Sequence, residues 1–553
     1  MSSQSPLQQA RLQYQPELPI ALQNINTVEV HKLKDPKFFH ESPEIADIFP
    51  LTHEAPFLEF KSGAKKSYGP LRVGVVLSGG QAPGGHNVIT GLHDALKKMN
   101  AESSLIGFLD GPSGIVGNQF IELTDALIQG YRNQGGFDMI GSGRTKIETQ
   151  VQFLAALETV KKHKLDGLVV IGGDDSNTNA ALLAEYFIAN ECNTTVVGVP
   201  KTIDGDLKSE AVEISFGFDT AAKHYSETIG SLMRDVLSAK KYYHFVKLMG
   251  RSASHIALEC ALQTHPNLAF ISEEVAVEKK SLKNLVDDIS DLVCKRALDK
   301  KEYGVILIPE GVVEFIPEVK KLIEELNGLL AVGQSHSSAL DNLESEKEKI
   351  EYISKLLTEE SLACFNTLPM ENRSQLLIGR DSHGNVQVSR IETERLMIEM
   401  VKKELSERSK TGSYKGSFSP LSYFCGYEGR SCLPSNFDSR YCYALGHVAA
   451  LLVDDKANGY ICCLGGLTKP VEEWIPGGVP LTTMMTIEER NGKTKPVIRK
   501  ALVDLKGKPF AAFQRQRGKW ADEDSYMNPG PIQFFGPEAI MDSITHTLSL
   551  EQS

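Results

Sequence analysis

Short runs of apolar residues, each followed by glycines or a proline, recur along the chain. Amphipathic, alanine-rich segments lie between them, and residues 151–164 (VQFLAALETVKKHK) after Thr149 are a clear example. Short, uniformly apolar runs are typical of strands buried on both faces of a parallel sheet. The pattern therefore predicts an α/β fold with parallel-rich sheets. The predicted strands are residues 71–77 (LRVGVVL), 165–171 (LDGLVVI), 194–199 (TTVVGV) and 303–308 (YGVILI).

Two segments depart from this alternation. Residues 333–339 (GQSHSSA) predict a loop, and residues 340–357 (LDNLESEKEKIEYISKLL) predict a charged amphipathic helix. We interpret this part of the chain as a solvated insertion packed on one face. Towards the end of the chain, Asn491-Gly492 separates two strand-like segments and suits a two-residue type I′ turn. Residues 481–502 therefore predict a β-hairpin.

The chain has 553 residues, which is enough for two or three domains with a core each. We expect residues 1–70 to form an N-terminal extension, because they are polar and contain several prolines. We expect two α/β domains, formed by residues 71–240 and 241–470. The second carries a helical insertion near residues 318–410. Residues 471–553 predict a C-terminal extension that packs back on the core.

Charge and composition exclude several classes of function. The formal net charge is −12, so the surface as a whole should repel nucleic acid and anionic membranes. A protein that handles anionic metabolites with this net charge must gather its cations locally. No apolar run approaches the roughly 18 residues that a membrane-spanning helix needs, and we expect no signal peptide.

The nine cysteines predict reduced thiols in a cytoplasmic protein. The C-terminal half contains Cys425, Cys432, Cys442, Cys462 and Cys463, a density that raises the alternative of a metal site. None of them forms a Cys-x-x-Cys pair, and no His-x₃₋₅-His follows, so zinc is the weaker interpretation.

A glycine loop follows the first predicted strand. Its residues 77–87 (LSGGQAPGGHN) contain two Gly-Gly pairs. Paired glycines let backbone N–H groups approach an anion, and the start of a following helix adds partial positive charge. The spacing matches neither a Walker A loop nor G-x-G-x-x-G. Taken alone, the loop is about equally consistent with two interpretations, a phosphate site and a tight turn between a strand and a helix.

A second loop, residues 172–176 (GGDDS), follows the next predicted strand. Adjacent carboxylates beside glycines suit a Mg²⁺ ion that keeps several waters and faces a polyphosphate. The alternative is a turn in which an aspartate caps the following helix.

A third loop, residues 200–206 (PKTIDGD), places Asp204 and Asp206 on either side of a glycine. Lys201 and Thr202 supply an ammonium and a hydroxyl just before them. Phosphoryl transfer to an alcohol needs a carboxylate to accept the hydroxyl proton and cations to stabilise the phosphoryl oxygens. A polar turn would explain the glycine and the aspartates but not the whole PKTIDGD sequence.

These loops, together with three later motifs, resemble the phosphofructokinases, and most closely the long form of the pyrophosphate-dependent 6-phosphofructokinases. The resemblance spans Leu71 to Arg430. It implies a phosphofructokinase-like fold of two parallel-rich α/β domains with the active site in the cleft. The motifs occur in the family's order: the glycine loop, GGDDS, PKTIDGD, Met249-Gly250-Arg251, Pro309-Glu310-Gly311 and Gly426-Tyr427-Glu428-Gly429-Arg430.

The resemblance implies a reversible transfer from pyrophosphate–Mg²⁺ to fructose 6-phosphate, a reaction of glycolysis and gluconeogenesis. The backbone of Gly80 resembles the contact to the donor phosphate, and Arg144 resembles the family's phosphate-bridging arginine. Asp174 resembles the Mg²⁺ ligand. Gln81 replaces an aspartate of the ATP-using branch, which matters little if the loop binds through its backbone.

For the sugar half of the site, Asp204 resembles the general base that takes the proton of the 1-hydroxyl. Glu310 resembles an acceptor for a sugar hydroxyl, and Arg251 resembles a catalytic contact. Lys241 and Tyr242 fall where the family presents substrate contacts from a neighbouring subunit, so the resemblance implies a homodimer. The other implied sugar-phosphate contacts are Thr202, Ile203, Asp206, Met249, Gly250, Glu428 and Gly429, with Tyr427 and Arg430 gripping the 6-phosphate.

Asp175 and Lys201 favour pyrophosphate over ATP. In the ATP-using branch a glycine follows Gly-Gly-Asp and leaves room for the α-phosphate, where Asp175 would place a carboxylate. Two like charges about 4 Å apart at an effective dielectric of about 20 repel by roughly 4 kcal/mol. We expect Lys201 to compensate Asp175 and to contact the two remaining phosphates. The alternatives are an Asp175 that only caps a helix, an ATP-dependent enzyme, and a non-catalytic regulatory subunit.

Overall fold

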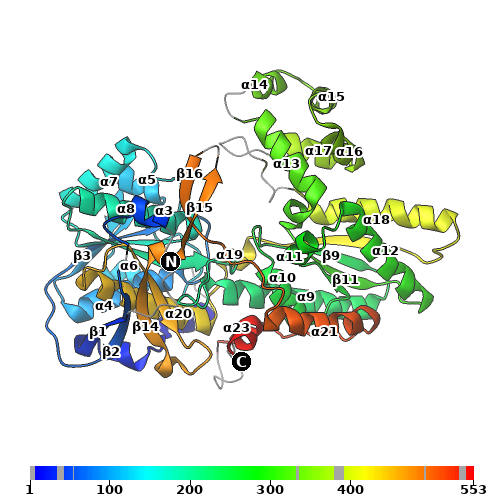
Figure 1. The fold of residues 1–553 in the computed structure, drawn as a ribbon. Coiled ribbons are helices and arrows are strands. Elements are labelled where there is room, and N and C mark those ends of the chain that lie inside the picture. Colours follow the sequence, from blue (N-terminus) through cyan, green and yellow to red (C-terminus); the bar gives the residue numbers. More distant parts are fainter. Residues whose placement is uncertain are drawn as a thin grey trace. The chain divides into compact units, whose positions relative to one another are not determined.

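The computed structural model describes residues 6–33, 43–53, 55–331, 335–378, 386, 391–490, 493–534 and 544–553. The chain forms two compact units, each assembled from separate stretches of sequence (Figure 1). Unit 1 consists of Met1–His224, Tyr427–Ala501 and Ile532–Ser553, and unit 2 consists of Tyr225–Gly426 and Leu502–Pro531.

Unit 1 is built on a large mixed sheet whose described strands run in the order β1-β2-β14-β13-β7-β6-β3-β4-β5. The pairs among β13, β7, β6, β3 and β4 are parallel, while the pairs at both edges are antiparallel. The strands are β1 (Val28–Leu33), β2 (Phe57–Ser62), β3 (Arg72–Leu77), β4 (Ser104–Phe108), β5 (Phe120–Glu122), β6 (Gly167–Gly172), β7 (Thr195–Thr202), β13 (Tyr460–Gly465) and β14 (Ile475–Pro480).

The central strands confirm the predicted apolar runs, since β3, β6 and β7 are buried along almost their whole length. Helices α4 (Gly85–Met99), α7 (Gln150–Lys162), α8 (Asp174–Ala189) and α20 (Asn436–Asp454) pack around this sheet. The predicted helix after Thr149 is α7, which Thr149 caps by accepting a hydrogen bond from the Gln152 backbone N–H.

Unit 2 contains a parallel sheet with the strand order β10-β11-β9-β12. Its strands are β9 (Tyr243–Leu248), β10 (Leu268–Ala269), β11 (Gly304–Pro309) and β12 (Pro420–Cys425), so the run at residues 303–308 is the predicted strand β11. Helices α10 (His255–Thr264), α12 (Leu282–Leu298), α18 (Thr393–Lys410) and α21 (Lys508–Asp522) lie along it (Figure 1). The two parallel-rich sheets and their helices confirm the predicted α/β class.

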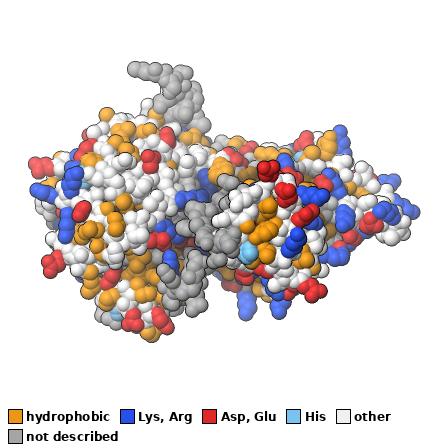
Figure 2. Space-filling view, turned by 90° about the horizontal axis from the view of Figure 1, so that it is seen from above, with side chains coloured by type: hydrophobic (Ala, Val, Ile, Leu, Met, Phe, Trp, Pro, Cys, Tyr) orange, Lys and Arg blue, Asp and Glu red, His pale blue; other side chains and the backbone are white. Residues whose placement is uncertain are grey.

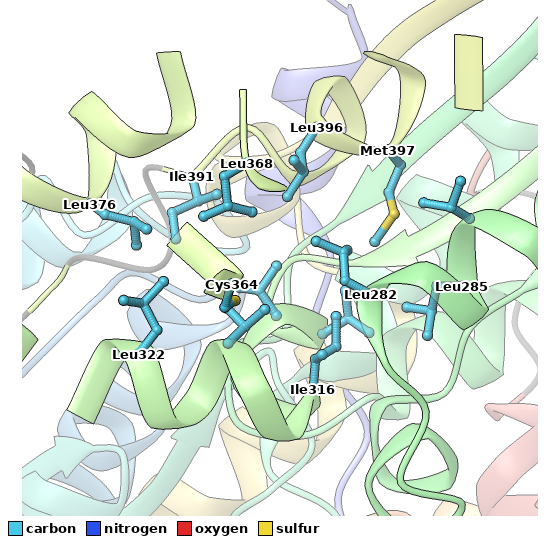
Figure 3. Close-up of a cluster of buried hydrophobic side chains, with 14 of the residues drawn as sticks. Leu282, Leu285, Ile316, Leu322, Cys364, Leu368, Leu376, Ile391, Leu396 and Met397 are labelled. Atoms are coloured by element: carbon cyan, nitrogen blue, oxygen red, sulfur yellow. The ribbon is translucent and has the colours of Figure 1, made fainter. Parts of the chain in front are cut away.

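The helical insertion of unit 2 shares a core with the rest of that unit. Helix α13 (Pro317–Leu329) buries Val319, Leu322, Ile323 and Leu326, the spacing of one apolar helix face. Side chains from α12, α13, α16 (Glu359–Thr367), α17 (Met370–Ile378) and α18 meet in one buried cluster (Figure 3). Helix α13 therefore packs against the rest of unit 2 through one face.

Two details of the insertion were predicted wrongly. The segment expected to be a loop forms α14 (Ser335–Asp341) over most of its length, and residues 333 and 334 lie outside the described residues. Its polar residues favour turns locally, but Leu340 is buried in the shared core and the His336 ring bonds the Tyr352 hydroxyl, with 2.9 Å between the two atoms. The following helix, α15 (Glu346–Ser354), is shorter than predicted because Ser345 caps it in a capping box.

The predicted hairpin is present in unit 1. Strands β15 (Met485–Arg490) and β16 (Lys493–Ile498) pair antiparallel, with Arg490 opposite Lys493. Asn491 and Gly492, which the prediction placed in the turn, lie outside the described residues.

Acidic and basic side chains are interspersed over the face that Figure 2 shows. Within the described ranges, no helix combines the length and the apolar composition that crossing a membrane requires.

Candidate active site

Three loops of unit 1 meet at one edge of its sheet. Strands β3, β6 and β7 are parallel neighbours, so the glycine loop, the GGDDS loop and the PKTIDGD loop all follow carboxyl ends at the same edge. The Ser176 hydroxyl donates to the Ser78 hydroxyl across 2.8 Å and links α8 to the end of β3. Open α/β sheets bind ligands at this edge.

The glycine loop leaves space that cationic side chains occupy. Gly79 has φ of +86°, and a Cβ there would lie 3.2 Å from Lys201 Nζ. A Cβ on Gly80 would lie 2.6 Å from Arg430 Nη1 and 3.8 Å from Arg144 Nη2. Any side chain at Gly80 would therefore displace a guanidinium. Three positive heads converge on two glycines, an arrangement suited to phosphate oxygens.

Arg144 reaches this position because its loop is attached to the end of β3. Ser78 and Gly143 form a parallel β-bridge, and the Gly79 N–H donates to the Gly143 carbonyl across 2.8 Å. The Gly79 amide is therefore committed to the backbone, and the cations rather than that N–H group face a ligand.

Lys201 is the most buried cation of the site, with 5% of its surface exposed. Burial, reinforced by the Arg430 and Arg144 charges and opposed by Asp204 and Asp174, lowers the pKa of its ammonium to about 8. A lysine so placed gains charge stabilisation when an anion binds beside it.

Asp174 and Asp204 act on the charge of Lys201, and Asp206 lies close to both aspartates. Asp174 is the first residue of α8, where the helix dipole favours a carboxylate. Burial raises the pKa of Asp206 to about 7, with Asp204 and Asp174 adding to the rise. Lys500 lowers the pKa of Asp206, and its Nζ lies 3.6 Å from Asp174 Oδ2.

Asp204 is held by its own turn. Its backbone N–H donates to Thr202 Oγ1 across 3.0 Å, and Gly205 takes φ of +74° to complete the turn. Within the part of the chain that the structure describes, Asp204 Oδ1 is buried and has no hydrogen-bond partner. A buried carboxylate oxygen left unpaired in this way is available to a substrate hydroxyl.

Asp175 has a partner that the sequence analysis did not single out. Lys146 Nζ lies 3.0 Å from Asp175 Oδ1, and about half of each side chain is exposed, 42% for Lys146 and 52% for Asp175. Lys146 follows Arg144 by two residues, so a loop already assigned to phosphate binding could have drawn attention to it. Lys500, more than 290 residues after the acidic loops in sequence, had no such indication.

The GYEGR motif contributes to the same group in unit 1. Its last three residues lie in the short helix α19 (Glu428–Ser431), whose Ser431 hydroxyl donates to Gln81 Oε1 across 2.6 Å. Gly429 is buried and Tyr427 is exposed. Arg430, expected at the sugar 6-phosphate, lies beside Gly80 in the structure.

The sugar-side motifs of unit 2 also meet at the edge of their sheet where the carboxyl ends of the strands lie. Met249-Gly250-Arg251 follows β9, and Glu310-Gly311 follows the neighbouring parallel strand β11. The Glu310 N–H donates to the Leu248 carbonyl across 2.9 Å, and a Cβ on Gly311 would lie 1.9 Å from the Arg251 carbonyl oxygen. Gly311 is therefore required for the two loops to touch. Ile203, by contrast, is buried in unit 1.

Lys241 and Tyr242 lie at the other end of β9. They precede the strand while Met249–Arg251 follow it, and six residues of strand span about 20 Å. Lys241 Nζ stacks over the Tyr242 ring, 5.0 Å from its centroid. Within unit 2 the structure therefore separates this pair from the other sugar-side residues.

The residues around Asp174 fit a Mg²⁺ ion. Among the described residues, no group of three or more His, Cys, Asp or Glu side chains is arranged to hold a metal. Mg²⁺ is commonly held by one or two carboxylates, waters and substrate phosphates rather than by a protein cage. The Asp174 side chain, 28% exposed and beside the phosphate-binding cations, suits that mode.

Comparisons with known proteins agree with the motifs. The family model for phosphofructokinase matches residues 72–353. The chain is 50% identical over its full length to the whole of a pyrophosphate–fructose 6-phosphate 1-phosphotransferase of Porphyromonas gingivalis. It is 54% identical to the β1 subunit of the Arabidopsis thaliana enzyme of that name, over 92% of this chain and 88% of that protein.

Among solved structures, the fold is similar to that of a pyrophosphate-dependent phosphofructokinase of Nitrosospira multiformis. The TM-score is 0.53 at 16% sequence identity, over 86% of this chain and 96% of that one. At this identity the likeness concerns the fold alone.

The lowered pKa of Lys201 predicts a pH dependence. Lys201 is charged below about pH 8 and neutral above it, so kcat/KM for pyrophosphate should fall as the pH rises through 8, by roughly 10- to 100-fold. Lys201→Arg keeps its charge over this range and should lose this inflection. Initial rates between pH 7 and 9.5 measure both profiles. The ionisation of pyrophosphate is common to both enzymes, so identical profiles would contradict the role of Lys201.

Proposed function

Because the chain belongs to the phosphofructokinase family, we propose that it transfers a phosphoryl group from pyrophosphate to the 1-hydroxyl of fructose 6-phosphate. The products are fructose 1,6-bisphosphate and phosphate, and the reaction is reversible. The observation that carries the proposal is the group of cations, Lys201, Arg144 and Arg430, gathered on the glycine loop opposite Asp174 and Asp204. The relatives' names give the same donor and acceptor, as the sequence predicted.

In this proposal Asp204 accepts the proton of the 1-hydroxyl while that oxygen forms its bond to phosphorus. The bond from phosphorus to the bridging oxygen breaks, and the leaving phosphate takes the electron pair. The unpaired, buried Oδ1 of Asp204 supports its role as the base. Lys201 and Arg144 stabilise the phosphoryl oxygens, and bound Mg²⁺, held through Asp174, would neutralise negative charge on the phosphates.

The proposed sugar site draws on the carboxyl edge of unit 2, where Arg251 and Glu310 are brought together. Lys241 and Tyr242 lie at the opposite end of β9, which supports a role in the active site of a second subunit. We therefore propose a homodimer whose substrate sites are shared. We also propose a cytoplasmic location, which the nine free cysteines support, because a reducing compartment keeps thiols unpaired.

Donor choice depends on Asp175. Its carboxylate would lie near the α-phosphate of ATP, but Lys146 offsets part of the charge and solvent reaches both side chains. We therefore expect the repulsion to be weaker than the roughly 4 kcal/mol of an isolated pair at an effective dielectric of about 20, with the bulk of the side chain adding to it.

The proposal predicts that the wild-type enzyme uses pyrophosphate and is almost inactive with ATP. Asp175→Gly should shift the ratio of kcat/KM for ATP to that for pyrophosphate by roughly 10- to 1,000-fold towards ATP. Asp175→Asn is the matched control, because it removes the charge but keeps the bulk. Initial rates with each donor on fructose 6-phosphate give the ratio. Strong wild-type activity with ATP would overturn the donor assignment and leave the acceptor assignment intact.

Asp204→Asn should remove the proton acceptor with little change in shape. Loss of a general base typically lowers kcat by about 10²- to 10⁴-fold. Binding of pyrophosphate, measured by calorimetry, should change little because the cations remain in place. A variant that retains more than half of the wild-type kcat would exclude Asp204 as the base.

A further inference from the structure

The chain segment after strand β16 is fixed against the acidic loops of unit 1. The Ile498 N–H donates to Thr178 Oγ1 on α8 across 3.1 Å, and the Arg499 N–H donates to the Met484 carbonyl across 3.0 Å. The Ala501 N–H donates to the Asp206 carbonyl across 2.8 Å. These bonds on both sides of Lys500 hold it between the start of α8 and the PKTIDGD loop.

Lys500 faces the carboxylates that the proposed reaction uses. Its Nζ lies 3.6 Å from Asp174 Oδ2, longer than a hydrogen bond but close enough for strong charge attraction. The Lys500 charge also acts on Asp206, whose pKa it lowers against the effect of burial. About a third of the Lys500 side chain is exposed, 32%, so the ammonium is accessible to a ligand.

A pocket of about 190 Å³ opens beside Lys500. Its lining also includes Lys208 and Arg499, the carboxylate of Glu210, and an apolar wall of Ala211, Val479 and Met484. Lys208 pairs with Glu551, so Arg499 and Lys500 supply the positive charge that favours the approach of an anion here.

We propose that Lys500 is a pyrophosphate-binding residue, which pairs with Asp174 when the site is empty and turns to a phosphate oxygen when pyrophosphate binds, alone or with Mg²⁺. The inference rests on the proposed function. Asp174 would release the Lys500 ammonium to bind Mg²⁺, which carries twice its charge, and the flexible lysine stem would let the freed head move. Lys500 lies outside residues 72–353, the part of the chain that the family model matches.

The alternative is that Lys500 only attaches the hairpin to α8. The two roles predict opposite changes in Mg²⁺ affinity when the Lys500 charge is removed. If Lys500 competes with the metal, its removal leaves Asp174 freer to bind Mg²⁺, and Mg²⁺ alone should bind more tightly. If it only supports the fold, its removal should weaken Mg²⁺ and pyrophosphate binding together.

The test uses Lys500→Met, which keeps the length of the side chain and removes the charge, and Lys500→Arg, which keeps the charge. Lys495→Met is the matched control, because Lys495 lies on β16, the strand just before Lys500, and pairs with Glu148 at the surface, 3.3 Å away. Calorimetry measures the binding of pyrophosphate without metal and of Mg²⁺ without pyrophosphate, and initial rates give KM for each substrate.

For Lys500→Met we expect metal-free pyrophosphate to bind roughly 5- to 30-fold more weakly and Mg²⁺ alone roughly 3- to 10-fold more tightly. KM for pyrophosphate should rise while KM for fructose 6-phosphate stays unchanged, Lys500→Arg should restore most of the loss, and Lys495→Met should match the wild type. Unchanged pyrophosphate binding, or parallel weakening of both ligands, would overturn the inference. A wild-type enzyme that does not use pyrophosphate would instead overturn the proposed function.

Discussion

A lysine ammonium that is nearly excluded from water destabilises a fold by several kcal/mol unless opposite charges compensate it. Lys201 is in this position at the end of β7, with the guanidinium groups of Arg144 and Arg430 increasing the cost and Asp174 and Asp204 offsetting it. The need to compensate the buried Lys201 ammonium explains much of the structure of unit 1 around the end of β7. The glycines at 79 and 80 leave room for the cations, and the adjoining loops bring carboxylates to face them.

The same balance explains why the site is suited to a small, highly charged ligand. Without a ligand, the cations share a limited number of carboxylates and the pKa of Lys201 is lowered. A polyphosphate supplies the missing negative charge, so binding relieves a cost already present in the fold. The aspartates are in the reverse situation: burial, together with the neighbouring carboxylates Asp204 and Asp174, raises the pKa of Asp206, and Lys500 only partly offsets the rise. A divalent cation beside Asp174 would relieve it. Metal and polyphosphate are therefore expected to favour each other's binding.

The sequence was sufficient for those features that depend on local pattern. The apolar runs at β3, β6, β7 and β11 marked buried strands, and the loops after them followed from strand direction. The family followed from six ordered motifs, and the full-length relatives confirm it. The loop predicted at residues 333–339 failed because burial of Leu340 decided the structure there, and local polarity gave no sign of it.

For the same reason, contacts between distant parts of the chain could not be predicted from the sequence. Nothing in the local sequence shows that Lys500 approaches Asp174, or that Gln81 holds the helix of Arg430 through Ser431. The position of Arg430 beside Gly80 depends on that tie and on how far its side chain extends. Lys146 is intermediate, because its proximity to Arg144 in the sequence placed it near the site but could not identify Asp175 as its partner.

The central claim is that one site in unit 1 holds both the metal and the donor phosphates. A crystal structure with Mn²⁺ in place of Mg²⁺ and the non-hydrolysable analogue methylene diphosphonate tests it directly, because Mn²⁺ scatters anomalously. We expect an anomalous peak at coordination distance from the Asp174 carboxylate, with the diphosphonate contacting Lys201 and Arg144. A metal peak away from Asp174, or a diphosphonate bound without contact to Lys201, would contradict it.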